Sequence, residues 1–342
     1  MCYFQEKSHM FEAFSDFDIF EGGTRSMKRN MDIDLLMVTH KKIDYKVPDN
    51  CKKIQVNCAN TGEHWEGYLH DDEGENISNK NPYYCELTAL YWAWKNSSAD
   101  IIGLCHYRRF FTGSDMVLYH TYNLVKEKRL LKQAITDKKI EEYMSGNDII
   151  MGMPYGPHPR PAYTILCRYC YEKDIAIMRD VLAENHPEYL QACDEILQDT
   201  NVSYFNMMIC TREFCDKYCT WLFEVLNEVE ARVDISSYDT QHQRIYGYLG
   251  EILLNIYVCK NKVAVKYIRI AKLISEMDEF STFDYIKTLL YHGFECFCRK
   301  TGLQAFSDFC YRIGRNEVYN RHYACLDKME KVRRYKDAKE ED

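Results

Sequence analysis

Short apolar runs of strand type alternate with segments of helical periodicity through most of this chain. The runs that predict buried strands are residues 32–40, 52–59, 100–105, 147–153 and 203–210. The segments that predict helices are residues 82–96, 171–184, 187–198, 212–233 and 239–257, and Asn81 is expected as the N-cap of the first. Strands that alternate with helices favour an α/β fold, with a mostly parallel Rossmann-type sheet flanked by helices.

The two ends of the chain differ from its middle. Residues 1–30 mix aromatic and charged side chains without a clear period, so we treat them as an N-terminal extension. Residues 31–259 hold the alternating elements and are expected to form the main domain. Residues 260–342 alternate aromatic with basic residues, which predicts a helical C-terminal region. No apolar run approaches the ~20 residues that a membrane span requires.

Composition excludes two broad classes of protein. With 46% hydrophobic and 14% aromatic residues, the chain is too apolar to stay unfolded. Its 44 Lys and Arg against 52 Asp and Glu give a net charge of -8, which disfavours nucleic acid as a partner. Any anion site must therefore be local. The 16 cysteines are scattered and no secretory signal opens the sequence, so we expect reduced thiols in the cytoplasm.

Two close cysteine pairs raise the question of a zinc site. Cys167 and Cys170 form a C-x-x-C, and Cys215 and Cys219 lie four positions apart. A structural zinc site needs a second pair, or histidines at matching spacing, and neither accompanies these cysteines. Buried or free thiols are therefore the favoured interpretation, and a zinc-containing regulatory protein is kept as a third hypothesis.

The stretch DIIGLCHYRRFF carries the main functional signal. A buried strand ends in His106, Tyr107, Arg108 and Arg109 before two phenylalanines follow. In α/β sheets, ligands bind at the edge where the parallel strands end. Arginines hold phosphate with paired hydrogen bonds and keep their charge at any physiological pH. The strand end therefore predicts a site for a diphosphate.

Neighbouring residues support or compete with this interpretation. Asn79 and Lys80 precede a helix, whose free N–H groups also favour an anion. Alternatively, the two arginines pair with local carboxylates, for which the candidates are Asp71, Asp72 and Glu86.

The same region resembles a known fold. A polar Asn-containing loop, a helix, an apolar strand and a charged tripeptide follow one another as in the first half of a GT-A nucleotide-sugar glycosyltransferase. The segments ISNKNPYYCELTALYWAWKNSSADIIGLCHYRRFF, LLMVTHK and RIYGYLGEILLN resemble a bacterial family of capsular and exopolysaccharide synthesis glycosyltransferases that carries an uncharacterised-domain name. The resemblance covers residues 33–258 and implies a GT-A-like sheet. It also implies transfer of a hexose, such as galactose or galactofuranose, from a UDP-sugar to a glycan or lipid-linked acceptor.

The strand end departs from the GT-A pattern. There the resemblance implies Asp-x-Asp, whose carboxylates hold a divalent metal on the diphosphate, but this chain has His106-Tyr107-Arg108. Mn²⁺ or Mg²⁺ is therefore left open, with His106 as a candidate ligand. We expect Arg108 and Arg109 to neutralise the departing diphosphate instead.

Other donor-site residues follow from the resemblance. It implies that Thr39, His40 and Lys41 lie beside the nucleotide base and ribose, and that Asn206 faces the donor sugar. Tyr107 and Lys80 belong to the same predicted site. Further candidates for the ribose or phosphate are Asn76 and Asn79, although asparagine in a polar loop also serves simple turn formation.

A catalytic base is expected on the helix over residues 239–257. Arg244, Tyr248, Glu251 and Asn255 share one face of it by their spacing. An inverting enzyme needs a carboxylate to accept the acceptor's proton, and Glu251 is our prediction, with Arg244 and Tyr248 beside it. An Arg–Glu pair on a solvated helix would give the same pattern. The competing bases are Asp239 and Asp148, and retaining chemistry would need none.

The leading hypothesis is a cytoplasmic sugar transferase. Its basic C-terminal segments, YIRIAKLI, CFCRK and KMEKVRRYK, would allow peripheral contact with the inner face of a membrane. The alternative is a non-catalytic nucleotide-sugar or glycan-binding module on the same fold, which binds a donor without transferring it.

Overall fold

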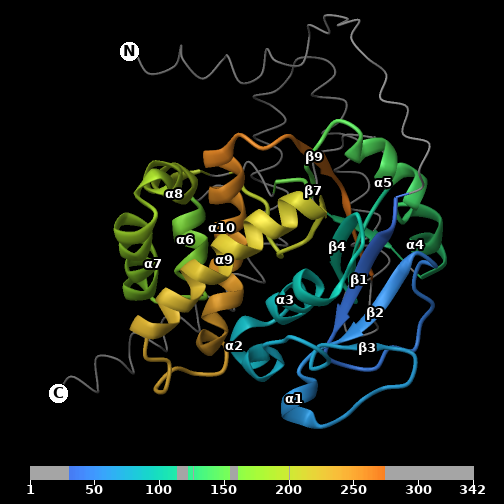
Figure 1. Cartoon of the computed structure of the whole chain (residues 1–342), viewed down its shortest axis with the longest axis horizontal. Coiled ribbons are helices and arrows are strands. Elements are labelled where there is room, and N and C mark those ends of the chain that lie inside the picture. Colours follow the sequence, from blue (N-terminus) through green and yellow to red (C-terminus); the bar gives the residue numbers. More distant parts are fainter. Residues whose placement is uncertain (1–30, 114–121, 126, 155–160, 200, 274–342) are drawn as a thin grey trace, which may run out of the picture. The chain divides into compact units, whose positions relative to one another are not determined.

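The computed structural model describes residues 31–113, 122–125, 127–154, 161–199 and 201–273 (Figure 1). The chain divides into two units, Met1–Met31 and Asp32–Asp342. Every helix and strand given below lies in the second unit.

The centre of this unit is a mixed sheet that is mostly parallel on one side. Strands β3 (Leu69–His70), β2 (Cys51–Gln55), β1 (Ile33–Thr39) and β4 (Ile101–His106) lie side by side and parallel. Beyond β4 the order continues with antiparallel β8 (Met208–Thr211), then β7 (Ile149–Gly152) and β9 (Val265–Ile268). The α/β class predicted from the alternating pattern is confirmed.

A second branch of the sheet leaves the end of β4. There β5 (Arg109–Phe111) folds back antiparallel, because His106 pairs with Arg109. Strand β10 (Ile270–Leu273) pairs with β5, and β6 (Tyr122–Val125) pairs with β10. Strand β10, near the end of the described residues, therefore pairs with β5, the strand that begins at Arg109.

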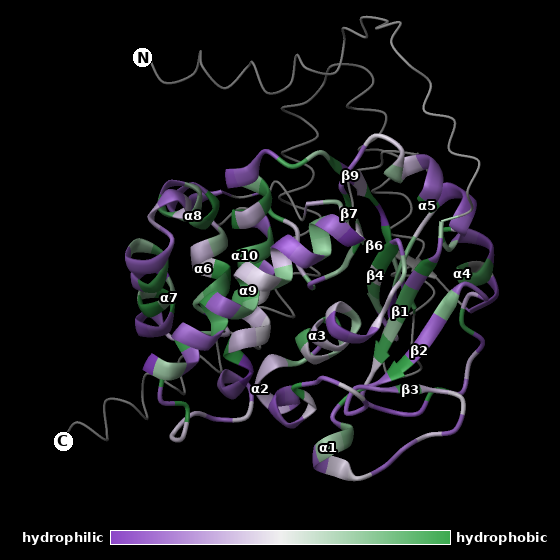
Figure 2. Cartoon of the chain, in the orientation of Figure 1, coloured by the Kyte–Doolittle hydropathy of each residue, from purple (hydrophilic) through white to green (hydrophobic). Residues whose placement is uncertain are grey.

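Helices cover the sheet and complete the core. They are α1 (Cys58–Thr61), α2 (Asn81–Tyr84), α3 (Leu87–Asn96), α4 (Glu127–Gln133), α5 (Asp137–Met144), α6 (Ala162–Leu166), α7 (Glu172–Asn185), α8 (Leu190–Gln198), α9 (Arg212–Arg232) and α10 (Ile245–Asn261), with 3-10 turns η3 (Ser78–Lys80), η4 (Pro187–Tyr189) and η5 (His242–Arg244). Figure 2 shows the hydrophobic residues along β1 and β4, where Leu36 and Leu104 are fully buried. Burial of such side chains stabilises the fold by about 1.5–3 kcal/mol each.

One predicted helix is in fact two. Residues 82–96 were expected to be continuous, but α2 ends at Tyr84, and Cys85 adopts φ 54 and ψ -130 before α3 begins. Asn81 is not an N-cap either, since it is the first residue of α2 and its side chain donates to the Cys85 carbonyl. This local hydrogen bond and a tertiary one, from Arg244 to the Cys85 sulfur, override the helical periodicity here.

The C-terminal region is not wholly helical as expected. Residues 265–273 form β9 and β10, and Ile270 and Ala271 are fully buried between their neighbours in the sheet. Most of the predicted membrane-contact segment YIRIAKLI is therefore part of the core. Segments CFCRK and KMEKVRRYK lie outside the described residues. Among the helices of the described part, none combines the length and hydrophobicity needed to cross a bilayer.

Candidate active site

The ends of β1 and β4 lie at one edge of the sheet. Val38 pairs with His106, and the Tyr107 N–H donates to the Val38 carbonyl over 3.0 Å. Thr39, His40 and Lys41 therefore sit beside the His-Tyr-Arg-Arg stretch, as the sequence predicted. Strand β7 runs in the same direction as β4, so Gly152 ends at this edge too.

A tight turn sets the direction of the two arginines. Tyr107 and Arg108 form the turn, and Arg109 opens β5 opposite His106. The Leu273 N–H donates to the Arg108 carbonyl over 2.8 Å, which ties the turn to β10. Phe110, next along β5, is buried and anchors the turn in the core.

Cationic and aromatic groups gather on the outer side of this turn. The Lys41 ammonium and the Arg108 guanidinium lie 5.1 and 5.8 Å from the centre of the Tyr107 ring. The His40 ring packs edge-on against the same ring at 5.4 Å. Partial desolvation lowers the pKa of His40, and the charges of Lys41, Arg244 and Arg108 lower it further. His40 is therefore neutral at pH 7.

The inner side of the turn faces Phe205. The His106 Nε2 lies 2.7 Å from the Phe205 carbonyl, so this nitrogen donates. The Arg109 guanidinium lies 4.4 Å from the centre of the Phe205 ring, and its buried Nε finds no acceptor within the described part of the chain. Burial lowers the pKa of His106, with Arg109 and Arg244 acting in the same direction against Glu86.

Glu251 on α10 completes the inner side. Burial and, to a lesser extent, the nearby Glu86 carboxylate raise the pKa of Glu251 to about 8. The charges of Arg109 and Arg244 and a hydrogen bond from the Phe205 backbone oppose this shift. Glu251 therefore sits beside a second carboxylate and two guanidinium groups.

Asn206 connects three elements at this point. Its Nδ2 donates to the Glu86 carboxylate over 2.8 Å and to the Gly247 carbonyl over 2.9 Å. Asn206 and Phe205 both have positive φ, 51 and 85, in the bend before β8. A Cβ atom at Gly250 would lie only 3.2 Å from Asn206 Oδ1, so glycine permits the close approach of α10. These contacts hold Glu86 and Glu251 at the same place.

Arg244 and Tyr248 extend the site along α10. The Arg244 Nε donates to the Cys85 sulfur over 3.1 Å, and its guanidinium lies 5.5 Å from the Tyr248 ring centre. The Tyr248 ring stacks on Tyr169 at 4.8 Å. Asn255, on the same helix face, is instead buried and bonded to the Ser203 backbone.

Several predicted site residues have other partners. The Lys80 ammonium pairs with Glu230 on α9 at 2.6 Å, and the Asn76 amide donates to the Asp72 and Gly74 carbonyls. Asn79 is exposed, and its carbonyl accepts from Asn60. The structure thus gives Asn76 the role of turn formation that the sequence left open.

The two alternative bases, Asp239 and Asp148, have other partners. Asp239 accepts from the backbone N–H groups of Gln241 and His242 and pairs with the His242 ring at 2.6 Å. Burial opposes its ionisation, but these hydrogen bonds outweigh burial and lower its pKa. Asp148 precedes β7, so it lies at the opposite edge of the sheet, where it accepts from Ala264.

Two of the three carboxylates proposed as partners of the arginines, Asp71 and Asp72, have partners elsewhere, whereas Glu86 lies at the site. Buried Asp71 accepts from the Asn57 and Cys58 backbone and from Ser78 and Thr88. Asp72 pairs with His64. Within the ranges that the structure describes, no ion pair is formed by Lys41, Arg108, Arg109 or Arg244. The charges of Lys41 and Arg108 are therefore available for an anion, while those of Arg109 and Arg244 also act on the carboxyl group of Glu251.

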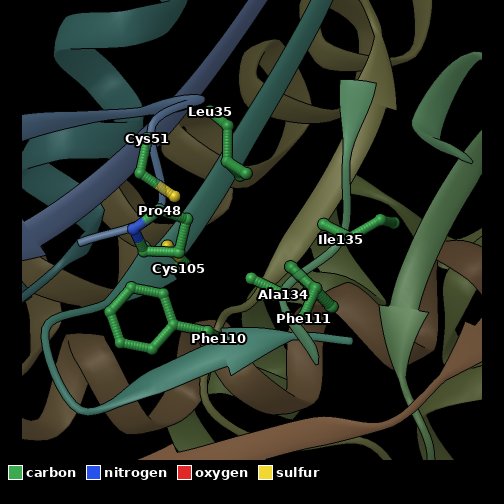
Figure 3. A pocket seen from close by; sticks show the side chains of 8 residues that line it. All are labelled: Leu35, Pro48, Cys51, Cys105, Phe110, Phe111, Ala134 and Ile135. Atoms are coloured by element: carbon green, nitrogen blue, oxygen red, sulfur yellow. The ribbon is translucent and has the colours of Figure 1, made fainter. Parts of the chain in front are cut away.

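The described side chains at the end of β4 do not form a cluster of metal ligands. His106 commits Nε2 to a carbonyl, and no set of three His, Cys, Asp or Glu ligand atoms converges on it among the described side chains. Next to the turn lies a small apolar pocket with no charged group in its lining, which Figure 3 shows. The residues that line it are Leu35, Pro48, Cys51, Cys105, Phe110, Phe111, Ala134 and Ile135.

Comparison with known proteins identifies the family. The family model "Domain of unknown function (DUF4422)" matches residues 34–262. This chain belongs to that family. A solved structure described as "WbbM bifunctional glycosytransferase apo structure" is similar to the chain, with a TM-score of 0.64 and 26% identity. The match covers 71% of this chain and 46% of that chain. No curated protein matches.

The DUF4422 domain also contains site residues that the sequence did not identify. Glu86 was considered only as a partner for arginine, and Phe205 was not considered at all. Phe205 lies far from β4 in sequence and Glu86 lies one helix before it, so the fold brings both to His106 and Arg109. The helix break at Cys85 was not predicted either, because the local sequence pattern gives no sign of it.

Proposed function

We propose that this DUF4422 protein is a glycosyltransferase that moves a hexose from a nucleoside diphosphate donor to a glycan or lipid-linked acceptor. The observation that carries the proposal is the set of unpaired cations at the strand edge beside a carboxyl of raised pKa. The similarity to a glycosyltransferase structure supports it. A UDP-hexose donor, such as UDP-galactose or UDP-galactofuranose, and a capsular or exopolysaccharide acceptor follow from the sequence resemblance.

The turn between β4 and β5 would neutralise the charge of the departing nucleoside diphosphate. The nucleoside diphosphate gains negative charge as the bond from the sugar C1 to the diphosphate oxygen breaks, and its electron pair leaves with that oxygen. Fixed positive groups stabilise this charge most when they are already in place. The buried Nε of Arg109 has no hydrogen-bond acceptor among the described residues. Arg108 and Lys41 both lie against the Tyr107 ring. His40 and Tyr107 would contact the nucleotide.

Glu251 would accept the proton from the acceptor hydroxyl. The acceptor oxygen forms a bond to C1 as its proton passes to the Glu251 carboxylate. A base is most effective when its pKa lies near the working pH, and burial beside Glu86 brings that of Glu251 to about 8. Direct displacement with such a base predicts inversion at C1, and the anomeric configuration of the product tests this.

A screen of nucleotide sugars tests the proposal. Thermal shift and transfer would be measured with and without Mn²⁺ and with a chelator. We expect one donor to stabilise the protein and to be transferred, and Arg109→Ala to weaken donor binding at least ~10-fold, since charge-assisted hydrogen bonds contribute about 1.5–3 kcal/mol. Arg179→Ala is the matched control, because Arg179 pairs with Asp194 on the helical side of the domain.

Two outcomes would contradict the proposal. If Arg108→Ala and Arg109→Ala leave donor binding and turnover unchanged, the turn does not bind the diphosphate. If a donor binds but is neither hydrolysed nor transferred to any acceptor tested, the protein is a binding module.

A further inference from the structure

A second cluster of chemically reactive side chains lies on the loops after β2 and around β3. Cys58 opens α1, His64 follows α1, and Asp72 follows β3. The cysteine sulfur, a histidine nitrogen and a carboxylate oxygen all lie within 4.8 Å of one another. None of these residues belongs to the cationic site at the end of β4.

The cluster brings together three side chains, whereas a surface ion pair brings together two. The His64 Nε2 lies 3.0 and 2.9 Å from the two Asp72 carboxylate oxygens. A simple His–Asp pair would explain this contact alone. The thiol of Cys58, a fully buried residue, donates to the Gln55 carbonyl over 3.4 Å and also lies within 4.8 Å of both groups, which a surface His–Asp pair does not require. The His70 ring also lies 4.5 Å from the His64 ring.

The backbone around each of the three residues is held by buried polar groups. The Gln55 side chain donates to the Glu63 carbonyl over 2.7 Å and accepts from the Trp65 N–H over 2.8 Å, so it fixes the chain on both sides of His64. The Asp71 carboxylate accepts from the Cys58 N–H over 3.1 Å. The loop is therefore built to present these side chains.

The Asp72 segment is fixed in the same way. The Asn76 amide donates to the Asp72 carbonyl over 2.9 Å, and Asn57, just before Cys58, holds a left-handed φ of 72. Asparagine adopts this conformation more readily than most residues other than glycine, and here it turns the chain into α1. Preorganised ligands of this kind distinguish a binding site from an accidental cluster.

We propose that Cys58, His64 and Asp72 bind a Zn²⁺ ion. A thiolate, an imidazole and a carboxylate form a donor set that zinc accepts in tetrahedral geometry, whereas Mg²⁺, Mn²⁺ and Ca²⁺ prefer oxygen donors alone. A water molecule completes the fourth position, because both ring nitrogens of His70 already contact Glu73 and the Trp65 carbonyl. The ion fastens α1 to the β3 edge, and this role is independent of sugar transfer.

Cobalt substitution of the full-length protein tests the site. Co²⁺ in a tetrahedral site with a thiolate gives a charge-transfer band in the near ultraviolet, and Zn²⁺ removes it by competition. We expect one equivalent of Co²⁺ to give this band in the unmodified protein and Cys58→Ser to abolish it. Cys259→Ser is the matched control, since Cys259 is exposed on α10, and should keep the band.

A second variant distinguishes loss of the metal site from misfolding of the Cys58→Ser protein. His64 is exposed, so His64→Gln should fold normally by circular dichroism and weaken Zn²⁺ binding at least ~10-fold. The proposal is overturned if the unmodified protein binds no stoichiometric Zn²⁺ or Co²⁺. It is also overturned if the charge-transfer band survives Cys58→Ser, because the metal then binds other thiols, such as buried Cys215 and Cys219, whose sulfur atoms lie 3.7 Å apart.

Discussion

The carboxyl group of Glu251 ionises in surroundings that favour its protonated form. Its helix position was predictable, because Arg244, Tyr248 and Glu251 share one face by spacing alone. Its ionisation was not, because Glu86 and Arg109 come from other elements. A sequence can therefore nominate a catalytic carboxylate, but the contacts that set its pKa are tertiary.

Replacing Glu251 with glutamine should separate binding from turnover. We expect Glu251→Gln to keep donor binding and to lower kcat by about 10²–10⁴-fold, the range of general base catalysis. In the unmodified enzyme the rate should rise as pH increases through about 8, because only the ionised carboxyl accepts a proton. Steady-state kinetics across pH measure both effects. Glu224→Gln, on the exposed side of α9, is the control, and equal activity of the two variants would exclude Glu251 as base.

The same carboxyl should also affect stability. Its pKa in the folded protein, about 8, exceeds its ordinary value of 4.5, so the folded state holds a proton that the unfolded state has lost. This contribution to the free energy of unfolding is present below the ordinary value and is lost as pH rises through about 8. Urea titrations near about pH 5 and about pH 9 should show a larger decrease for the unmodified protein than for Glu251→Gln. Parallel decreases would contradict the assignment.

At the scale of elements, the break between α2 and α3 determines where Glu86 lies. The sequence predicted one helix, because its apolar spacing is uninterrupted and neither glycine nor proline marks position 85. The left-handed φ of Cys85 is supported by Arg244, which donates to its sulfur, and by Asn81, which donates to its carbonyl. These partners were invisible in the local pattern.

The effect of a substitution at Cys85 on stability should depend on how well the new residue adopts a positive φ, rather than on the size of its side chain. Cys85→Val places a β-branched residue at positive φ and should lower the free energy of unfolding by at least ~1 kcal/mol. Cys85→Gly relieves this conformation and should be less destabilising than valine. Chemical denaturation measures both, with Cys259→Val as the exposed control. Equal effects of glycine and valine would refute the role of backbone strain.

At the scale of the whole molecule, the sheet extends beyond the predicted domain boundary. The family match ends at residue 262, yet β9 and β10 follow it and pair with β7, β5 and β6. The sequence missed them because each strand has four residues and basic side chains interrupt the apolar ones. Their pairing partners lie more than a hundred positions away, so no local window contains the signal. The alternating α/β pattern predicted β1, β2, β4, β7 and β8, but it also missed the short strands β3, β5 and β6.

A core substitution in β10 tests this extension. Ile270 is fully buried and lies against Gly152, where a Cβ atom would approach its side chain closely. We expect Ile270→Ala to lower the free energy of unfolding by about 2–5 kcal/mol, the cost of truncating a buried isoleucine. Tyr267→Ala, on neighbouring β9, is the control, because Tyr267 is 41% exposed and should cost less. If the two variants are equally stable, β10 is not part of the core.

The bond from the Leu273 N–H to the Arg108 carbonyl also has a kinetic consequence. Non-local strand pairs form late, because the chain must first close the long loop between them. During synthesis from the N-terminus, β1, β2 and β4 can pair long before β10 has been made. The turn that carries Arg108 and Arg109 is then held on one side only. The anion site therefore becomes complete only after residue 273 has left the ribosome, which delays ligand binding until the sheet is finished.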